Sequence, residues 1–346
     1  IVGNEYIDVI KYKDVLIVYD EDAPSFLRER NPRLFLPEDA PSDLKDAFYA
    51  NEKTNWLEGK TGFLMFFEQS TRTRNSFESG MAQLGGHATF LDTSMMQISH
   101  GESAKDTAVI LSSFGHMIAC RYCNWGLGNK YIREMAKWST VPIINLQCDL
   151  YHPMQALADL MTIEDEFGHT KNLKVSVIWA MATTHKKPIS VPVSQVLLFP
   201  RYGIDVTLAY PEGYDLPDWV IEKARKNAAE NGGSLTITHD MEAAYRDADV
   251  VFPKNWGSWV TNQSTTVVDD ALLALKAWKC TPEMMKLAKP SCRYMHALPA
   301  DRVNEVVDEV IDGPQSVVYQ EAENRIHTAK AVMSLFVHDK LPGDRR

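Results

Sequence analysis

The sequence predicts an α/β fold with two domains, each built on a parallel sheet flanked by helices, the two being joined by interdomain helices. Two observations lead to this prediction. Short apolar, strand-like runs alternate with helical patterns along the chain, and such alternation forms βαβ units. The chain has 346 residues, of which 45% are hydrophobic, and this is enough to bury two cores. Binding sites in such folds lie at the carboxyl ends of the strands.

The predicted elements follow one another in a regular order. The strands are expected at 63–67, 117–121, 141–145, 174–179, 205–209, 249–252 and 293–296. The helices are expected at 103–114, 154–167, 193–202, 218–231 and 319–337. Gly168 ends the second of these helices and Gly232 ends the fourth, as is typical of helix C-termini.

Helix 154–167 is the best candidate for a crossing between the domains, because a new series of βα units starts after it. Helix 319–337 follows the last strand and is expected to return to the first domain. We therefore expect a first domain made of residues 1–151 and 319–346, and a second domain made of residues 152–318.

Composition excludes several classes of partner. The net charge is -10 and the pI is about 5.5, which argues against nucleic acid or an anionic membrane as the main partner. No apolar stretch reaches the roughly 18 residues of a membrane span. Five cysteines, an odd number, favour a reduced, cytoplasmic protein. Cys120 and Cys123 are expected to be buried structural thiols, because no second pair stands at zinc spacing. We expect no cofactor and no metal.

The most informative stretch is Ser-Thr-Arg-Thr-Arg at 70–74. It follows an apolar run and precedes a helical pattern in which Phe77, Met81 and Leu84 share one face. The free N–H groups and the dipole of a helix N-terminus favour an anion. Hydroxyls and guanidinium forks at the same turn suit a phosphate or a carboxylate. A helix cap would need one hydroxyl and no arginine.

Other polar side chains stand where predicted strands end. His152 precedes Pro153, which suits a first helical position, and Gln155 lies in the first turn. Together they can polarise a carbonyl oxygen and orient an NH₂ group. Arg121 ends a strand and is a candidate anion ligand. Further candidates are Gln97 in a polar loop, His-Ala-Leu-Pro at 296–299, and Glu-Asn-Arg at 323–325.

These motifs, in this order and spacing, resemble the signature set of the aspartate/ornithine carbamoyltransferase superfamily. The resemblance covers most of the chain. It is greatest to the knotted, YgeW-type carbamoyltransferases, whose amine substrate is unassigned. The stretches that resemble this subgroup are 145–149, 179–180, 187–192, 209–214 and 252–256.

The resemblance implies a role for each matching residue. The residues that would hold the phosphate of carbamoyl phosphate are Ser70, Thr71, Arg72, Thr73, Arg121 and Arg325, with Gln97 from a neighbouring subunit. Those that would polarise the carbamoyl oxygen are Arg72, Thr73 and His152. Gln155 and the Leu298 carbonyl would orient the carbamoyl NH₂ group, with a cis peptide between Leu298 and Pro299. The shared phosphate site implies a homotrimer.

Two departures concern the amine. Where ornithine enzymes carry an aspartate, this chain has Lys254, and where they carry a cysteine it has Ala297. The resemblance therefore implies an amine other than ornithine, and Lys254 suits a carboxylate. The amine-substrate residues would be Lys254, Asn255, Trp256, His296 and Ala297. Residues 180–192 would form the loop of a trefoil knot, and residues 257–270 would close over the substrate.

We expect a carbamoyltransferase that acts on carbamoyl phosphate and a small amine, or that runs in reverse as a ureido phosphorolysis. One alternative is a non-catalytic regulator that binds carbamoyl phosphate. The other is a nucleotide-dependent dehydrogenase, which is disfavoured because no Gly-x-Gly-x-x-Gly follows any predicted strand.

Overall fold

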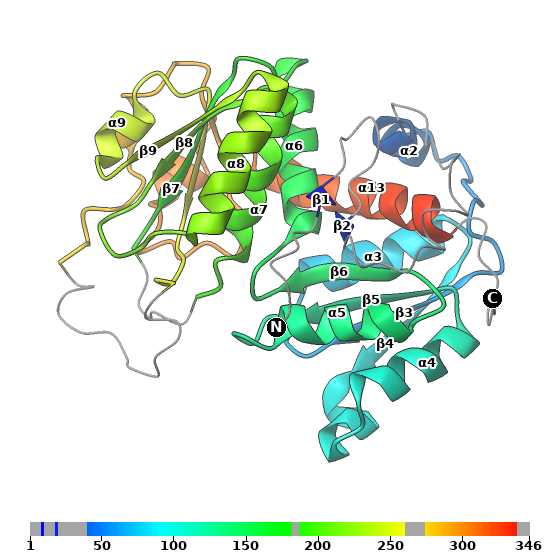
Figure 1. Cartoon of the computed structure of the whole chain (residues 1–346). Coiled ribbons are helices and arrows are strands. Elements are labelled where there is room, and N and C mark those ends of the chain that lie inside the picture. Colours follow the sequence, from blue (N-terminus) through cyan, green and yellow to red (C-terminus); the bar gives the residue numbers. More distant parts are fainter. Residues whose placement is uncertain (1–7, 10–17, 20–39, 182–186, 260–273, 338–346) are drawn as a thin grey trace. The chain divides into compact units, whose positions relative to one another are not determined.

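The computed structural model describes residues 8–9, 18–19, 40–181, 187–259 and 274–337. The chain divides into two compact units (Figure 1). Unit 1 is Ile1–Leu157 with Arg325–Arg346, and unit 2 is Ala158–Asn324. Two helices, α6 (Pro153–Phe167) and α13 (Val318–Val337), contribute residues to both units. Each unit has an α/β fold with its own parallel sheet.

Unit 1 contains a four-stranded sheet in the order β4-β3-β5-β6. Its strands are β3 (Thr61–Phe66), β4 (His87–Asp92), β5 (Met117–Tyr122) and β6 (Ile143–Cys148), and all neighbouring pairs are parallel. The helices between them are α3 (Arg72–Gln83), α4 (Ala104–Phe114) and α5 (Gly128–Trp138). Before the sheet come α2 (Ala40–Tyr49) and an antiparallel pair, β1 (Asp8–Val9) and β2 (Val18–Tyr19).

Unit 2 contains a five-stranded parallel sheet in the order β11-β10-β7-β8-β9. Its strands are β7 (Lys174–Trp179), β8 (Asp205–Ala209), β9 (Ser234–Thr238), β10 (Val250–Lys254) and β11 (Arg293–Tyr294). The chain proceeds outward from β7 to β9 and then returns to the other side of β7 with β10. The order reverses at this point, and binding sites of open α/β sheets lie beyond the strand ends at such a reversal.

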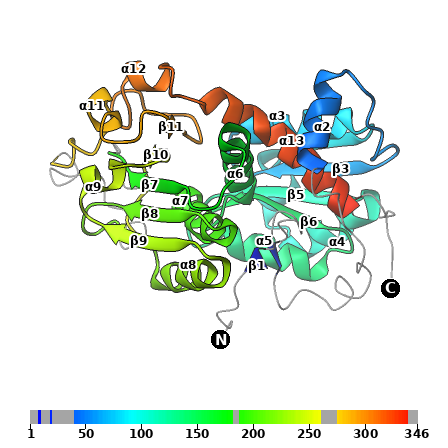
Figure 2. The ribbon, with the colours of Figure 1, turned by 90° about the horizontal axis from the view of Figure 1, so that it is seen from above.

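The helices of unit 2 are α7 (Ser190–Leu198), α8 (Asp218–Asn231), α9 (Met241–Tyr245), α11 (Pro282–Met285) and α12 (Asp308–Ile311). In Figure 2, α8 runs beside the edge of the sheet near β9. The helix predicted at 193–202 is split. Its end, Phe199–Tyr202, is a 3₁₀ turn, because Pro200 has no N–H to continue an α-helix.

The strands predicted at 174–179 and 205–209 and the helix predicted at 218–231 have the observed bounds. Two strands of the parallel sheets, β4 and β9, were not predicted, and neither was the short pair β1 and β2. β4 and β9 are edge strands of their sheets, and neither has a fully buried residue. Their sequences are correspondingly polar and lack an apolar run. The prediction for β6 was shifted, because the strand starts after Pro142 and continues to Cys148.

Two expectations lie partly outside the described residues. The predicted knot loop at 180–192 contains residues 182–186, and the predicted closing loop at 257–270 contains residues 260–270. In the part of the chain that the structure describes, no helix is long and apolar enough to span a membrane. All five cysteines are free, and Cys120 is buried whereas Cys123 is partly exposed.

Candidate active site

The turn between β3 and α3 carries the predicted anion ligands. β3 ends at Phe66 and α3 begins at Arg72, with Thr71 as its N-cap residue. The Thr71 side chain does not accept a capping hydrogen bond. The first-turn N–H groups and the positive end of the helix dipole therefore keep their capacity for a bound anion. Ser70 is partly exposed, Thr71 is exposed and Thr73 is buried.

Arg121 lies beside this turn because of the sheet register. It pairs with Phe66 at the carboxyl end of β3, and the Phe67 N–H donates to the Arg121 carbonyl oxygen at 3.0 Å. Arg121 thus lies on β5, the strand adjacent to β3, and β3 leads directly into the turn. The position predicted for it at a strand end is confirmed.

His152 and Gln155 come from the next strand along the sheet. β6 ends at Cys148, and α6 starts at Pro153, as the sequence predicts. The His152 side chain is buried, and burial lowers its pKa well below the ordinary value. The positive charges of Arg325, Arg121 and Arg72 lower it further. His152 is therefore neutral at physiological pH and suits a hydrogen bond rather than a charge.

Arg325 joins this group from α13, far along the sequence. Its guanidinium donates to Oε1 of Gln155 at 2.9 Å and to the hydroxyl of Thr73. All of these residues belong to unit 1. The structure thus gathers the following predicted residues into one cluster at the ends of three adjacent strands: Arg72, Thr73, Arg121, His152, Gln155 and Arg325.

Arg74 does not join the cluster. Its guanidinium forms an ion pair with Glu78 at 3.1 Å and lies over the ring of Phe90 on β4, 3.5 Å from the ring centroid. Its guanidinium is thus engaged by Glu78 and Phe90 and not by the residues around His152. A cavity of about 900 Å³ lies beside the turn and is lined by Phe66, Phe67, Glu68, Gln69, Ser70, Thr71, Arg74, Phe90 and Asp92.

Gln97 is also separate from the cluster. It begins a 3₁₀ turn, Gln97–His100, and its side chain is exposed. Within the described residues its one side-chain hydrogen bond joins Oε1 to Nδ1 of His100 at 3.2 Å. Among the described residues, the Gln97 side chain therefore has no hydrogen bond to the anion-binding turn of its own chain.

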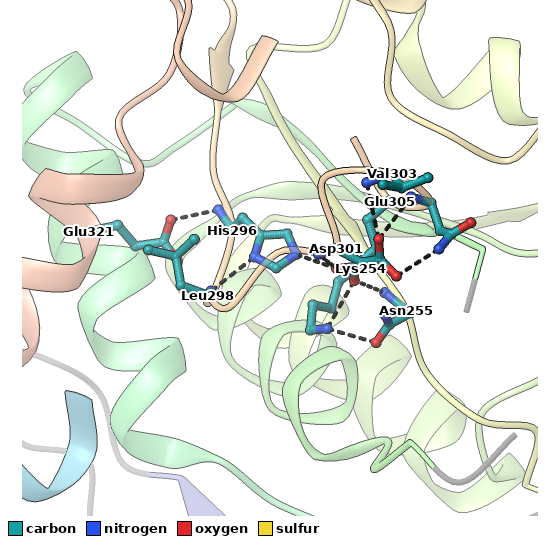
Figure 3. Close-up of polar contacts among 9 residues, drawn as sticks. Lys254, Asn255, His296, Leu298, Asp301, Val303, Glu305 and Glu321 are labelled. Atoms are coloured by element: carbon teal, nitrogen blue, oxygen red, sulfur yellow. Dashed lines mark hydrogen bonds and ion pairs between the residues drawn. The ribbon is translucent and has the colours of Figure 1, made fainter. Parts of the chain in front are cut away.

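A second polar cluster lies in unit 2 and centres on Glu305 (Figure 3). This carboxylate is completely buried. Its Oε1 accepts from Nζ of Lys254 at 2.9 Å and from the Asn255 N–H at 2.7 Å. Its Oε2 accepts from the Asp301 N–H at 2.6 Å and faces Nε2 of His296 at 3.3 Å. Lys254 ends β10, and His296 follows β11.

The ring of His296 is held in one tautomer. The Leu298 N–H donates to Nδ1 of His296 at 2.9 Å, so Nδ1 carries no proton and the ring proton is on Nε2, toward Glu305. The His296 main-chain N–H donates to Glu321 at 2.8 Å. The predicted cis peptide between Leu298 and Pro299 is confirmed.

The charges of Lys254 and Glu305 depend on each other. Burial alone would raise the pKa of Glu305, but the Lys254 charge and the contact with His296 hold it below its ordinary value. Burial lowers the pKa of Lys254, and the adjacent Glu305 carboxylate counteracts this effect. Glu305 is thus ionised, and Lys254 has a counter-charge in direct contact.

The remaining predicted amine-site residues have different settings. Asn255 is buried, and its Oδ1 accepts from Nζ of Lys254 at 2.8 Å. Trp256 is fully buried, and its indole N–H donates to the Tyr214 carbonyl oxygen at 3.0 Å, which makes it a core residue. Ala297 is buried between His296 and Leu298.

Sequence reasoning missed Glu305 and Asp301. Both follow the His-Ala-Leu-Pro motif closely, and acidic residues four positions apart after a strand-end histidine were a usable signal. The Asp301 carboxylate accepts from the N–H groups of Val303 and Asn304, each at 3.0 Å, and fixes the turn that presents Glu305.

Both units are open parallel sheets with polar clusters at the strand ends, as in enzymes that act on small molecules. Comparisons with known proteins specify the class. The carbamoyl-phosphate-binding domain of aspartate/ornithine carbamoyltransferases matches residues 38–165, and the aspartate/ornithine-binding domain of the same enzymes matches residues 173–336. The chain belongs to the aspartate/ornithine carbamoyltransferase family and is a carbamoyltransferase.

Several relatives are similar over most of their length. The anabolic ornithine carbamoyltransferase of Pyrococcus furiosus is 40% identical over 279 residues, which are 81% of this chain and 84% of that protein. YgeW of Escherichia coli (strain K12), a carbamoyltransferase by name, is 36% identical over 322 residues, covering 82% of this chain and 81% of that protein.

Solved structures of carbamoyltransferases are also similar to this chain. That of ornithine carbamoyltransferase from Pyrococcus furiosus superimposes with a TM-score of 0.79 at 37% identity, over 88% of this chain and 92% of that one. The structure of acetylornithine transcarbamylase complexed with acetylcitrulline superimposes with a TM-score of 0.77 at 30% identity. The match covers 86% of this chain and 95% of that one. None of these matches supports a dehydrogenase or a non-catalytic binding protein.

Proposed function

We propose that the enzyme transfers a carbamoyl group between carbamoyl phosphate and a small amine other than ornithine. The observation that supports this most strongly is the unit 1 cluster, in which Arg72, Arg121 and Arg325 surround a neutral His152. Three guanidiniums supply the positive charge that a phosphate dianion needs. The neutral imidazole supplies a hydrogen-bond donor for the carbamoyl oxygen without adding a fourth charge.

The reaction follows from these groups. The neutral amine attacks the carbamoyl carbon, and negative charge develops on the carbonyl oxygen, where His152 and Arg72 stabilise it. This attack forms the new C–N bond. The bond between the carbamoyl carbon and the phosphate oxygen then breaks, and the amine proton passes to the leaving phosphate. The products are a ureido compound and hydrogen phosphate. No separate general base is needed, so most of the rate comes from orientation and electrostatics.

Two arginines of the same turn provide the test. Arg72→Ala removes a member of the cluster, whereas Arg74→Ala removes an arginine that is paired with Glu78. We expect Arg72→Ala to lose about 2–4 kcal/mol of transition-state stabilisation, and Arg74→Ala to retain most activity. Phosphate release from carbamoyl phosphate with a panel of amines measures both. Equal activity of the two variants would contradict the assignment of Arg72.

The amine is proposed to carry a carboxylate or a ureido oxygen that Lys254 binds. Lys254 has three N–H donors, and two of them contact Glu305 and Asn255 within the described residues. Its side chain is 18% exposed, and the third donor is proposed to serve the ligand. An ammonium at this position disfavours a second cationic group on the substrate.

We propose a homotrimer in which Gln97 serves the phosphate site of a neighbouring subunit. Two observations support this: Gln97 is exposed with no side-chain hydrogen bond to its own turn among the described residues, and α4 exposes the apolar residues Val109, Ile110 and Phe114. Mixing inactive Arg72→Ala and Gln97→Ala proteins should restore some activity, because hybrid trimers contain sites with neither defect. Absence of recovery in hybrids confirmed by native mass spectrometry would refute sharing.

A further inference from the structure

Glu305 occupies an unusual position for a carboxylate. Its side chain is completely buried, yet it accepts from three donors and faces a fourth, so both oxygens are fully engaged (Figure 3). The turn that presents it is fixed by Asp301, whose carbonyl oxygen also accepts from the Glu305 N–H at 2.9 Å. A buried carboxylate with this many donors is held in one orientation.

We propose that Glu305 is a positioning residue of the amine-substrate site: it keeps Lys254 charged and directed. This inference rests on the proposed function only where it concerns the amine. The ion pair itself can be tested without any substrate.

The argument for Lys254 concerns the charges around its ammonium. Glu305 and Asp301 are the anions that favour its charged form, whereas Lys187 disfavours it. His296 faces the same carboxylate but is neutral, since its Nδ1 accepts from the Leu298 N–H. Burial lowers the pKa of Lys254. Without Glu305, the buried ammonium would lose its contact counter-charge and would release its proton more easily.

Substrate specificity depends on the N–H donor of Lys254 that Glu305 and Asn255 do not use. Because Glu305 and Asn255 take two N–H groups of Lys254, its remaining donor has a fixed direction. The Lys254–Glu305 pair has no net charge, so it offers one directed donor rather than a free cation. Such a group selects an acceptor oxygen at one place on the amine, and it gives no attraction to a second ammonium.

Chemical labelling tests the charge of Lys254 directly. Acetic anhydride reacts with the unprotonated amine, and mass spectrometry measures the labelling rate of Lys254 between pH 7 and 10. We expect Glu305→Gln to raise the rate at pH 8 by about tenfold, since one pKa unit changes the unprotonated fraction by that factor. Glu309→Gln is the matched control, because it removes an exposed glutamate of α12 in the same unit.

Glu305→Asp keeps the charge with a shorter side chain and should give a smaller rise. It also provides the comparison if Glu305→Gln does not fold, which melting temperatures of all variants will reveal. Unchanged labelling of Lys254 in folded Glu305→Gln protein, or in Glu305→Asp protein where that is the only folded variant, would overturn the proposal.

Kinetics test the consequence for the amine. We expect Glu305→Gln to raise the KM for the best amine at least about tenfold, while the KM for carbamoyl phosphate changes by less than about twofold. In a Lys254→Met background the same substitution should have little further effect. If labelling of Lys254 is faster but the KM for the amine is unchanged, the effect of Glu305 on the charge of Lys254 is supported, but its role in positioning the amine is refuted. An equal rise in KM for the amine and for carbamoyl phosphate would indicate a purely structural role and overturn the proposal.

Discussion

Lys330 provides a test of stability that depends on one buried ammonium. It lies on α13 in unit 1 and is only 1% exposed. Its Nζ donates to the main-chain oxygen of Leu44 on α2 at 2.9 Å and lies 5.3 Å from the centroid of the Phe48 ring. No carboxylate contacts it among the residues described, and burial lowers its pKa to about 8.

The free energy follows from proton linkage. The unfolded lysine has a pKa near 10.5, so between about pH 8 and 10.5 the unfolded chain holds a proton that the folded chain has released. The contribution of Lys330 to stability therefore rises as pH increases through this window. The difference of about 2.5 between the two pKa values corresponds to roughly 3 kcal/mol.

We expect Lys330→Met to be more stable than wild type at pH 7, by about 1–3 kcal/mol, and to lose this advantage by pH 10.5. Urea titrations at several pH values measure the difference in unfolding free energy between the two proteins. Thiols and tyrosines that titrate in the same pH range contribute equally to both proteins, so their contribution cancels in this difference. Lys137→Met, at an exposed lysine of α5, is the control. A difference between Lys330→Met and wild type that does not change with pH would refute the reasoning.

Three further predictions concern other parts of the chain. Gly128→Ala would place its Cβ 1.7 Å from the carbonyl oxygen of Tyr122, so we expect a loss of at least about 2 kcal/mol in stability, measured by thermal denaturation. Ornithine should be a very poor substrate compared with carboxylated amines that lack a second amino group, such as aspartate, and Lys254→Ala should reduce this preference; efficient ornithine turnover by the wild type would contradict the assignment of Lys254. An experimental trace of residues 180–192 should show the chain passing through this loop, and an unknotted path would exclude the predicted trefoil.

The sequence was most informative where a function depends on contiguous residues. The turn at 70–73 and the pair His152 and Gln155 each lie within one strand–turn–helix connection, so spacing alone placed them at helix N-termini. Arg121 could be placed because a strand end has a fixed position in a parallel sheet. Glu78 stands four residues after Arg74 on the same helix, so this ion pair could have been read from the sequence, whereas the contact with Phe90 of β4 arises only in the packed structure.

The contacts that escaped prediction join residues far apart in the chain. Glu305 meets Lys254 across 51 positions, and Arg325 meets Thr73 across 252. A buried carboxylate and an exposed one look the same in a sequence, so the sequence indicated only a substrate carboxylate as the partner of Lys254. The structure shows that it has a partner. That partner changes its expected role from a charge that attracts any anion to a donor with one direction.

Burial has opposite consequences for charge in the two clusters, and this difference matters for the chemistry. His152 is buried among arginines and is therefore neutral, so the unit 1 cluster keeps a net positive charge for a phosphate dianion. Lys254 is buried against Glu305, so this pair in unit 2 carries no net charge. An attacking amine must be unprotonated. A neutral ion pair gives no attraction to the protonated amine, and the Lys254 ammonium opposes it, so this pair favours the form of the amine that can react.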